Sequence, residues 1–163
     1  MNANTDRIEK QVLLQVPRER MWSALADAQQ FGTWFGVRFD APFVEGSKVT
    51  GRITPTKVDA EVAEMQKPHE GTPFEWVVEK IEPMQRIMFR WHPFAMDEGV
   101  DYASEPMTRI LFELHDAGEG ILLTVTESGF DALPPARREK ALAANDDGWA
   151  HQMMLIAKYL VRE

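Results

Sequence analysis

The order of segments along the sequence predicts an α+β fold in which a curved antiparallel sheet wraps around one long C-terminal helix. Three observations predict it: a strand followed at once by a helix, a middle section of period-two apolar segments, and a C-terminal section with helical periodicity. A sheet with one apolar face needs one apolar partner, and the terminal helix is long enough to supply it. A length of 163 residues suits one domain, expected to cover residues 1–163.

The N-terminal part is expected to form one strand and two short helical elements. Apolar residues alternate with polar ones at Ile8, Val12, Leu14 and Val16, which is the period of a strand with one buried face. Pro17 ends this strand and suits the first turn of a helix, because its missing N–H is one that the helix would not use. The helix places Trp22 and Leu25 on one stripe, and a short element at 29–35 brings three aromatic rings together.

The middle of the chain reads as strands separated by turns. Alternating apolar residues, bounded by proline or glycine, predict strands at 48–56, 74–83, 86–93, 107–116 and 121–129. The last two are joined by the short Gly-containing segment 117–120, which predicts a hairpin. Two acidic segments interrupt the pattern: 58–71, expected to be a loop with one helical turn, and 94–106.

The C-terminal part predicts two helices, a first over 133–144 and a longer one beginning at Asn145. Asn145 or Asp146 would cap the free N–H groups of its first turn. Its inward stripe recurs every three to four residues at Trp149, Met153, Ile156 and Leu160. Gly148 is expected to let the start of this helix approach the sheet closely.

Composition excludes several classes of partner and chemistry. The formal net charge is −8 and Lys and Arg form no cluster, so nucleic acid is not an expected partner. The absence of cysteine removes disulfides and thiolate chemistry. The polar first residues, and the lack of any apolar run near the roughly 20 residues that cross a bilayer, predict a cytoplasmic protein without membrane insertion.

No cofactor and no metal are expected. The sequence has no phosphate-binding loop, no G-x-G-x-x-G and no G-x-S-x-G segment. The histidines form no pair with metal-ligand spacing; they are His69, His92, His115 and His151, and the last is expected to face solvent. The acidic residues Asp97, Glu98 and Asp101 lack the glycine and final glutamate of a calcium loop, so a solvated loop is the better interpretation.

Glu127 is the candidate polar contact of a ligand. If Leu123 and Val125 face inward, strand alternation sends Glu127 inward too, where a carboxylate is costly unless it is paired or reaches a wet cavity. There it would act as an acid or base, or hydrogen-bond the polar end of a ligand. The alternative is that the strand frays after it and leaves Glu127 at the surface. Its nearest candidate partners, Arg90 and His92, alternate onto the outer face.

Aromatic residues are the strongest positive signal in the sequence. Such residues usually form a core, yet a curved sheet around a single helix leaves volume that one helix face does not fill. We therefore predict a cavity for a small apolar or aromatic ligand. Its expected lining is Trp34, Phe35, Trp76, Phe89, Trp91, Phe112, Glu127, Phe130, Trp149 and Met153.

Four segments in the same order carry a family resemblance: "VPRERMWSALAD" with "FGTWF", "VEKIEPMQRIMFRW", "GILLTVTESGF" and "DDGWAHQMMLIAKYL". Together they resemble the family named for the activator of the 90-kDa heat-shock-protein ATPase, within the START-like (SRPBCC, birch-pollen-allergen-like) superfamily. The resemblance implies a helix-grip fold, with a curved antiparallel sheet of about six to seven strands around the C-terminal helix. It also implies a cavity that Trp149 and Met153 line, and it supplies no catalytic motif.

The expected function is therefore binding of a small hydrophobic molecule. One alternative, which the superfamily implies, is a polyketide cyclase- or dehydratase-like enzyme with Glu127 as acid or base. Another is a protein-interaction module, as a chaperone partner or a homodimer, whose acidic segments Asp59–Glu70 and Asp97–Glu105 would meet a basic surface. The eponymous cochaperone of the family has an additional N-terminal domain that this chain lacks, so we expect its role to carry over poorly.

Overall fold

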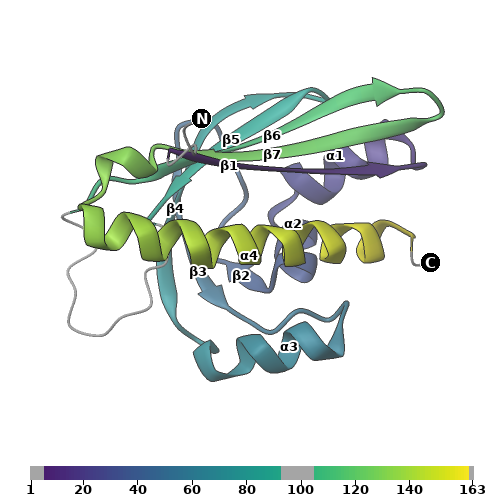
Figure 1. Ribbon diagram of the computed structural model, residues 1–163. Helices are drawn as coiled ribbons and strands as arrows, with labels where there is room; N and C mark the ends of the chain where they lie inside the picture. The colour runs from purple at the N-terminus through teal and green to yellow at the C-terminus, as the bar shows by residue number, and fades with distance from the viewer. Residues whose placement is uncertain (1–5, 93–104, 162–163) are drawn as a thin grey trace.

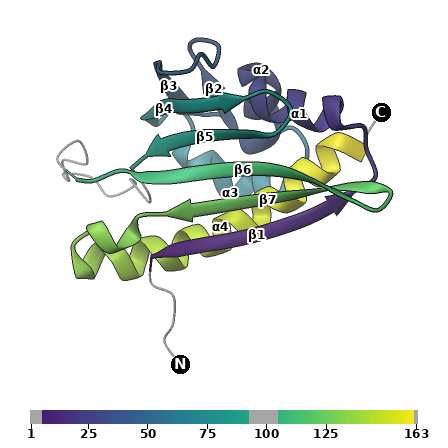
Figure 2. The same ribbon diagram turned by 90° about the horizontal axis from the view of Figure 1, so that it is seen from above.

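Seven antiparallel strands form one sheet in the computed structural model, which describes residues 6–92 and 105–161 (Figure 1). The strand order is β1-β7-β6-β5-β4-β3-β2, so the first strand lies beside the last and the others follow as sequence neighbours (Figure 2). The strands span Arg7–Leu14 (β1), Val37–Phe39 (β2), Lys48–Ile53 (β3), Pro73–Glu82 (β4), Arg86–Trp91 (β5), Thr108–Ala117 (β6) and Gly120–Ser128 (β7). The predicted α+β class and the long C-terminal helix are confirmed.

The helices lie on one side of this sheet. They span Arg18–Ala26 (α1), Ala28–Phe35 (α2), Ala60–Gln66 (α3) and Pro135–Val161 (α4), with short 3-10 turns at Lys67–His69 (η1) and Phe130–Ala132 (η3). Helix α4 crosses the inner face of the sheet, with α2 behind it and α3 below it in the view of Figure 1. None of the helices in the described part of the chain is long and apolar enough to cross a membrane.

The space between the sheet and the helices is filled by aromatic rings centred on Phe31. Its ring centroid lies 4.7 Å from that of Trp34 and 5.7 Å from those of Trp76, Phe89 and Phe112. All five side chains are 0% exposed. Helix α2 therefore contributes the centre of the core, and the sheet and α4 close around it.

Local signals in the sequence set the ends of α2. The Asp27 carboxylate accepts hydrogen bonds from the backbone N–H groups of Gln29 (2.9 Å) and Gln30 (3.3 Å), which caps the N-terminus. Gly36 ends the helix with a φ of 93°, a left-handed conformation that favours glycine. The Trp34 indole N–H donates to the carbonyl of Ala24 at 2.9 Å, which ties α2 to α1.

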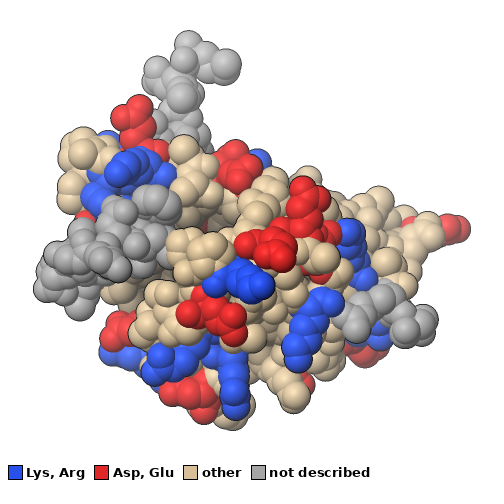
Figure 3. Space-filling model, turned by 90° about the horizontal axis from the view of Figure 1, so that it is seen from below, with Lys and Arg blue, Asp and Glu red and all other residues tan. Residues whose placement is uncertain are grey.

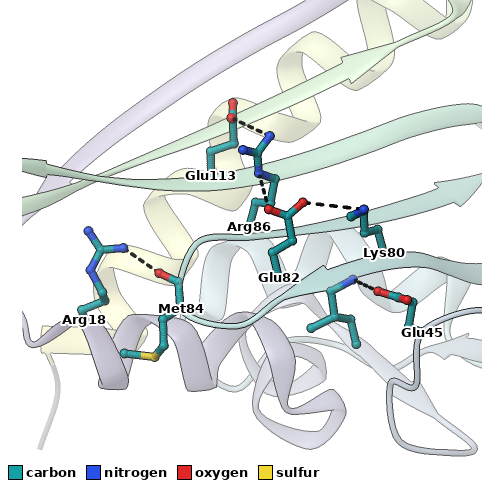
Figure 4. Close-up of polar contacts among 8 residues, drawn as sticks. Arg18, Glu45, Lys80, Glu82, Met84, Arg86 and Glu113 are labelled. Carbon is teal, nitrogen blue, oxygen red and sulfur yellow. Dashed lines mark hydrogen bonds and ion pairs between the residues drawn. The ribbon is translucent and has the colours of Figure 1, made fainter.

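Charged side chains cover the outer face near the β4–β5 turn (Figure 4). Arg86 lies 3.3 Å from Glu82 and 3.9 Å from Glu113. Arg18, at the start of α1, donates to the carbonyl of Met84 at 2.6 Å. Met84 has a φ of 67°, which non-glycine residues seldom adopt, so this bond helps to hold the turn. The face in Figure 3 also intersperses acidic and basic side chains, without a large area of one sign.

The C-terminal helix differs from the prediction in two respects. It is one helix of 27 residues from Pro135, so the predicted break before Asn145 is wrong. Asn145 and Asp146 lie inside it and use their side chains for contacts with the sheet, to Glu127 at 2.9 Å and to Lys10 at 3.0 Å. The expected close approach to the sheet at Gly148 is also wrong, because a Cβ there would meet no atom of the sheet within 4 Å.

Replacing Gly148 by alanine should therefore raise the stability of the protein. Alanine restricts the unfolded chain and favours the helix, and the added methyl group meets open space. We expect the free energy of unfolding to rise by about 0.5–1 kcal/mol, as measured by denaturant unfolding of Gly148→Ala and the parent protein. A decrease would mean that the helix approaches its neighbours more closely here than the structure shows.

Candidate functional site

Glu127 of β7 is the one ionisable side chain that is buried among the described residues, and it is 0% exposed. Strand alternation puts it on the same face as Leu123 and Val125, so its carboxylate points into the interior. Oxygen Oε2 accepts hydrogen bonds from Trp91 Nε1 (2.7 Å) and Thr108 Oγ1 (2.5 Å), and Oε1 accepts from Asn145 Nδ2 (2.9 Å) and Trp149 Nε1 (2.7 Å). Each oxygen thus receives two donors, which offsets part of the cost of removing it from water.

Strand register and helix periodicity bring these donors together. Trp91 is the last residue of β5 and is paired with Thr108, the first residue of β6. Ile110, two residues further along β6, is paired with Glu127. Asn145 and Trp149 are four residues apart on α4, so their side chains lie on one side of that helix. The cluster therefore joins the ends of three neighbouring strands to α4.

Burial raises the pKa of Glu127 above its ordinary value of 4.5, because water no longer solvates the charge. The four hydrogen bonds, with that of Thr108 as the strongest, lower the pKa and so oppose part of this rise. The folded protein consequently holds this proton more tightly than the unfolded chain does. Protonation of Glu127 therefore adds to the free energy of unfolding. This contribution is fully present below pH 4.5 and is lost as pH rises through the folded-state pKa of Glu127.

A groove of about 490 Å³ opens beside the cluster, and this volume falls within the ~300–1,000 Å³ typical of small-molecule sites. Residues of α4 and α3 form two of its walls, and residues of β3, β4 and the end of β5 form the floor. Trp91 and Asn145 belong both to the groove and to the Glu127 cluster. Its apolar lining comes from Phe35, Val37, Ile53, Val62, Met65 and Phe74.

The backbone carbonyl of Phe35, at the end of α2, frames this groove. It accepts one hydrogen bond from Gln66 Nε2 of α3 and one from Gln152 Nε2 of α4, each at 3.1 Å. A Cβ at the next residue, Gly36, would lie 2.5 Å from the Gln66 amide, so only glycine fits between them. Helices α3 and α4 are thereby linked through one atom of α2.

Two of the residues predicted for a ligand cavity, Phe35 and Trp91, line the groove. The other aromatic ones lie in the packed core, and Trp149 is 3% exposed. Met153 is likewise buried, at 5%. Glu127 lies directly behind the groove wall and is separated from it by Trp91 and Asn145.

The structure also tests the predicted positions of three polar residues, Arg90, His92 and His151. Arg90 is exposed on the outer face, as predicted, and bonds to Glu79 at 2.9 Å. The prediction that His92 lies on that face is wrong: β5 ends at Trp91, alternation stops there, and His92 lines the groove. His151 was expected to face solvent, and it lies half-buried at the groove with a contact to the carbonyl of Asp147 at 2.9 Å.

Sequence reasoning missed the wall that α3 provides, because this segment read as an acidic loop. The signals for a helix were present: Asp59 accepts from the N–H of Val62 at 2.9 Å and so caps α3. Val62 and Met65, three residues apart, both line the groove. The three acidic residues considered for a cation lie outside the described residues; they are Asp97, Glu98 and Asp101.

A larger hollow of about 700 Å³ lies against α2 and β2. Charged side chains of both signs line it, with Asp27, Arg38, Asp40 and Lys57 among them. It contains none of the residues predicted for a ligand cavity. We place the candidate site in the smaller groove, because it contains two of the residues predicted for a ligand cavity and borders the Glu127 cluster.

Comparison with known sequences identifies one family. The model of the family described as Activator of Hsp90 ATPase homolog 1-like protein matches residues 15–161. No curated protein matches the chain.

Several solved structures share the fold. DynU16, a protein of the dynemicin biosynthetic locus, is 24% identical with a TM-score of 0.66, and the match covers 95% of this chain and 47% of DynU16, so the chain spans about half of its length. Protein MLL2253 from Mesorhizobium loti is 18% identical with a TM-score of 0.68, covering 94% of this chain and 96% of that protein. The Aha1 dimer from Colwellia psychrerythraea is 15% identical with a TM-score of 0.66, covering 94% and 95%. At these identities the likeness extends to the fold alone.

Replacing Glu127 by glutamine should destabilise the protein most at low pH. A protonated carboxyl donates to Thr108 and still accepts from the Trp91 indole, whereas a glutamine NH₂ placed there leaves that indole N–H without an acceptor. We expect a loss of about 1–3 kcal/mol below pH 4.5. This loss should shrink as pH rises through the folded-state pKa of Glu127, because the parent protein loses its proton-linked stability there.

The measurement is denaturant unfolding of both proteins at several pH values. Glu127→Ala is the matched variant: it leaves all four donors without an acceptor and should cost more than glutamine at every pH. A destabilisation by Glu127→Gln that grows as pH rises would place the folded-state pKa of Glu127 below 4.5. That result would contradict the conclusion that burial raises this pKa.

Proposed function

The chain belongs to the family of Activator of Hsp90 ATPase homolog 1-like proteins, and we propose that it binds a small hydrophobic or aromatic molecule in the groove between α3, α4 and the sheet. Gly148 is the observation that carries this proposal. It lies inside α4 and lines the groove, and apart from its chain neighbours and the backbone of its own helix no atom lies within 4 Å of the position of a Cβ. A glycine there costs about 1 kcal/mol relative to alanine and answers no packing need. What it does provide is open groove volume.

The apolar part of the groove lining supports a ligand with a largely apolar body. No Lys or Arg side chain is among the described residues that line it, Asp147 is the one carboxylate, and His69, His92 and His151 also line it. Met65 is 53% exposed, and a flexible thioether of this kind adapts its shape to a ligand. Phe35, Phe74 and Trp91 add flat aromatic surface on the floor and wall.

Binding is favoured over catalysis because of the position of Glu127. Its side chain is 0% exposed, and both of its oxygens already accept two hydrogen bonds. A general acid or base must reach the proton that it transfers. A ligand in the groove would meet Trp91 and Asn145 first, so we assign Glu127 to holding these two groove residues in position.

The homodimer and the chaperone contact stay predictions for this chain. One relative was solved as a dimer, and that property is its own. Of the two acidic segments expected to meet a partner, residues 59–70 form α3 and η1 with their flanking turns, and Asp59 pairs with Lys158 of α4. The second segment, Asp97–Glu105, lies almost wholly outside the described residues.

Filling the groove from Gly148 should abolish binding without unfolding the protein. We expect 2-naphthol to stabilise the parent protein, by about 2.7 kcal/mol when present at a hundred times its dissociation constant. In Gly148→Leu the new side chain occupies the groove, and affinity should fall by more than about tenfold, or 1.4 kcal/mol. Calorimetric titration and thermal unfolding measure both quantities.

The matched control is Ala150→Leu, which adds the same side chain on an exposed position of the same helix. It should bind 2-naphthol as the parent protein does. Unchanged affinity in Gly148→Leu, or equal losses in both variants, would show that the groove is not the binding site.

A further inference from the structure

Two polar atoms at the groove lack a hydrogen-bond partner among the described residues. They are Oε1 of Gln152, on α4, and Nδ1 of His92, just after β5; both atoms are buried, and both residues line the groove. Leaving a buried acceptor unpaired costs about 1–3 kcal/mol. Buried polar atoms in folded proteins are nearly always paired, so two exceptions at one groove call for a physical explanation.

The neighbour of the Gln152 amide determines which of its two terminal atoms is the nitrogen and which is the oxygen. Its Nε2 donates to the carbonyl of Phe35 at 3.1 Å, and a carbonyl can only accept, so the unpaired atom of this amide is the oxygen. The corresponding amide of Gln66 has no such deficit, because its Oε1 accepts from the N–H of Thr56 at 2.8 Å. Gln152 is thus the amide at the groove with an unused acceptor.

Gln152 can also turn toward the groove without creating a new unpaired atom on the backbone. The carbonyl of Phe35 receives two donors, and the bond from Gln66 Nε2 at 3.1 Å remains when Gln152 moves away. Because Gln152 lines the groove, rotation about its terminal torsions is the movement that would present its Oε1 to a ligand there. The bond that is given up is the redundant one.

We infer that the ligand of this groove carries a hydrogen-bond donor, an aromatic hydroxyl or an amide N–H on an otherwise apolar body, and that Gln152 is the residue that selects it. This inference rests on the proposed function. A purely apolar ligand would seal the groove and leave the Gln152 oxygen unpaired, whereas a donor-bearing ligand pairs it.

A matched pair of probes tests the inference: 2-naphthol, which has an O–H donor, and 2-methoxynaphthalene, which has the same rings and oxygen but no donor. We expect the parent protein to bind 2-naphthol about tenfold more tightly, the ratio that corresponds to about 1.4 kcal/mol. In Gln152→Met, which keeps the length of the side chain and removes the amide, this preference should vanish. Affinity for 2-methoxynaphthalene should stay within about twofold of the parent value, because it makes no use of the amide.

A second readout needs no ligand. Gln152→Met removes an unpaired acceptor and leaves the Phe35 carbonyl bonded to Gln66, so its denaturation midpoint should equal or exceed that of the parent protein. Equal affinity of the parent protein for the two probes, or a preference for 2-naphthol that survives in Gln152→Met, would overturn the inference and leave the groove as a binding site. If neither probe binds, the proposed function fails and the inference fails with it.

Discussion

Burying the Glu127 carboxylate constrains the positions of every element around it. The penalty for taking this group out of water is offset only when donors converge on both oxygens, and here they come from β5, β6 and α4. Because the bonds are directional, α4 cannot slide or rotate on the sheet without leaving Asn145 or Trp149 unpaired. Apolar packing alone, which is not directional, would not fix the helix in this way.

The groove depends on that constraint and on one further link. Glu127 holds Trp91 and Asn145 at one edge, and the bond from Gln66 Nε2 to the carbonyl of Phe35 ties α3 to α2 at the other. Between these two fixed edges, α4 presents Gly148 in place of a side chain. The rings of α2 fill the region beneath the sheet, so open volume remains at the side of the core rather than at its centre.

The fold could be predicted because period-two segments and a long amphipathic C-terminal segment are local signals. The start of α4 could not be predicted, because the run Asn145, Asp146 and Asp147 resembles the start of a helix. Contacts of Asn145 with β7 and of Asp146 with β1 explain why the helix continues through this run. Alternation along β7 raised the inward position of Glu127 as one of two options. The four donors to Glu127 are 18 to 36 residues away in sequence, so no pattern of local residue spacing could identify them. The groove could not be predicted either, because one of its walls is α3, and the sequence analysis expected a loop with one helical turn there.

The pairing of β1 with β7 has a kinetic consequence. Residues 113 positions apart, Gln11 and Thr124, share a hydrogen bond across this seam, and every other strand in the order follows its sequence neighbour. The hairpins can form early from nearby segments, whereas β1 must wait as an unpaired strand until β7 has been synthesised. Closing so long a loop is slow, and an exposed strand edge invites pairing with other chains. During synthesis, β1 therefore stays unpaired for longer than the strands that pair with a sequence neighbour.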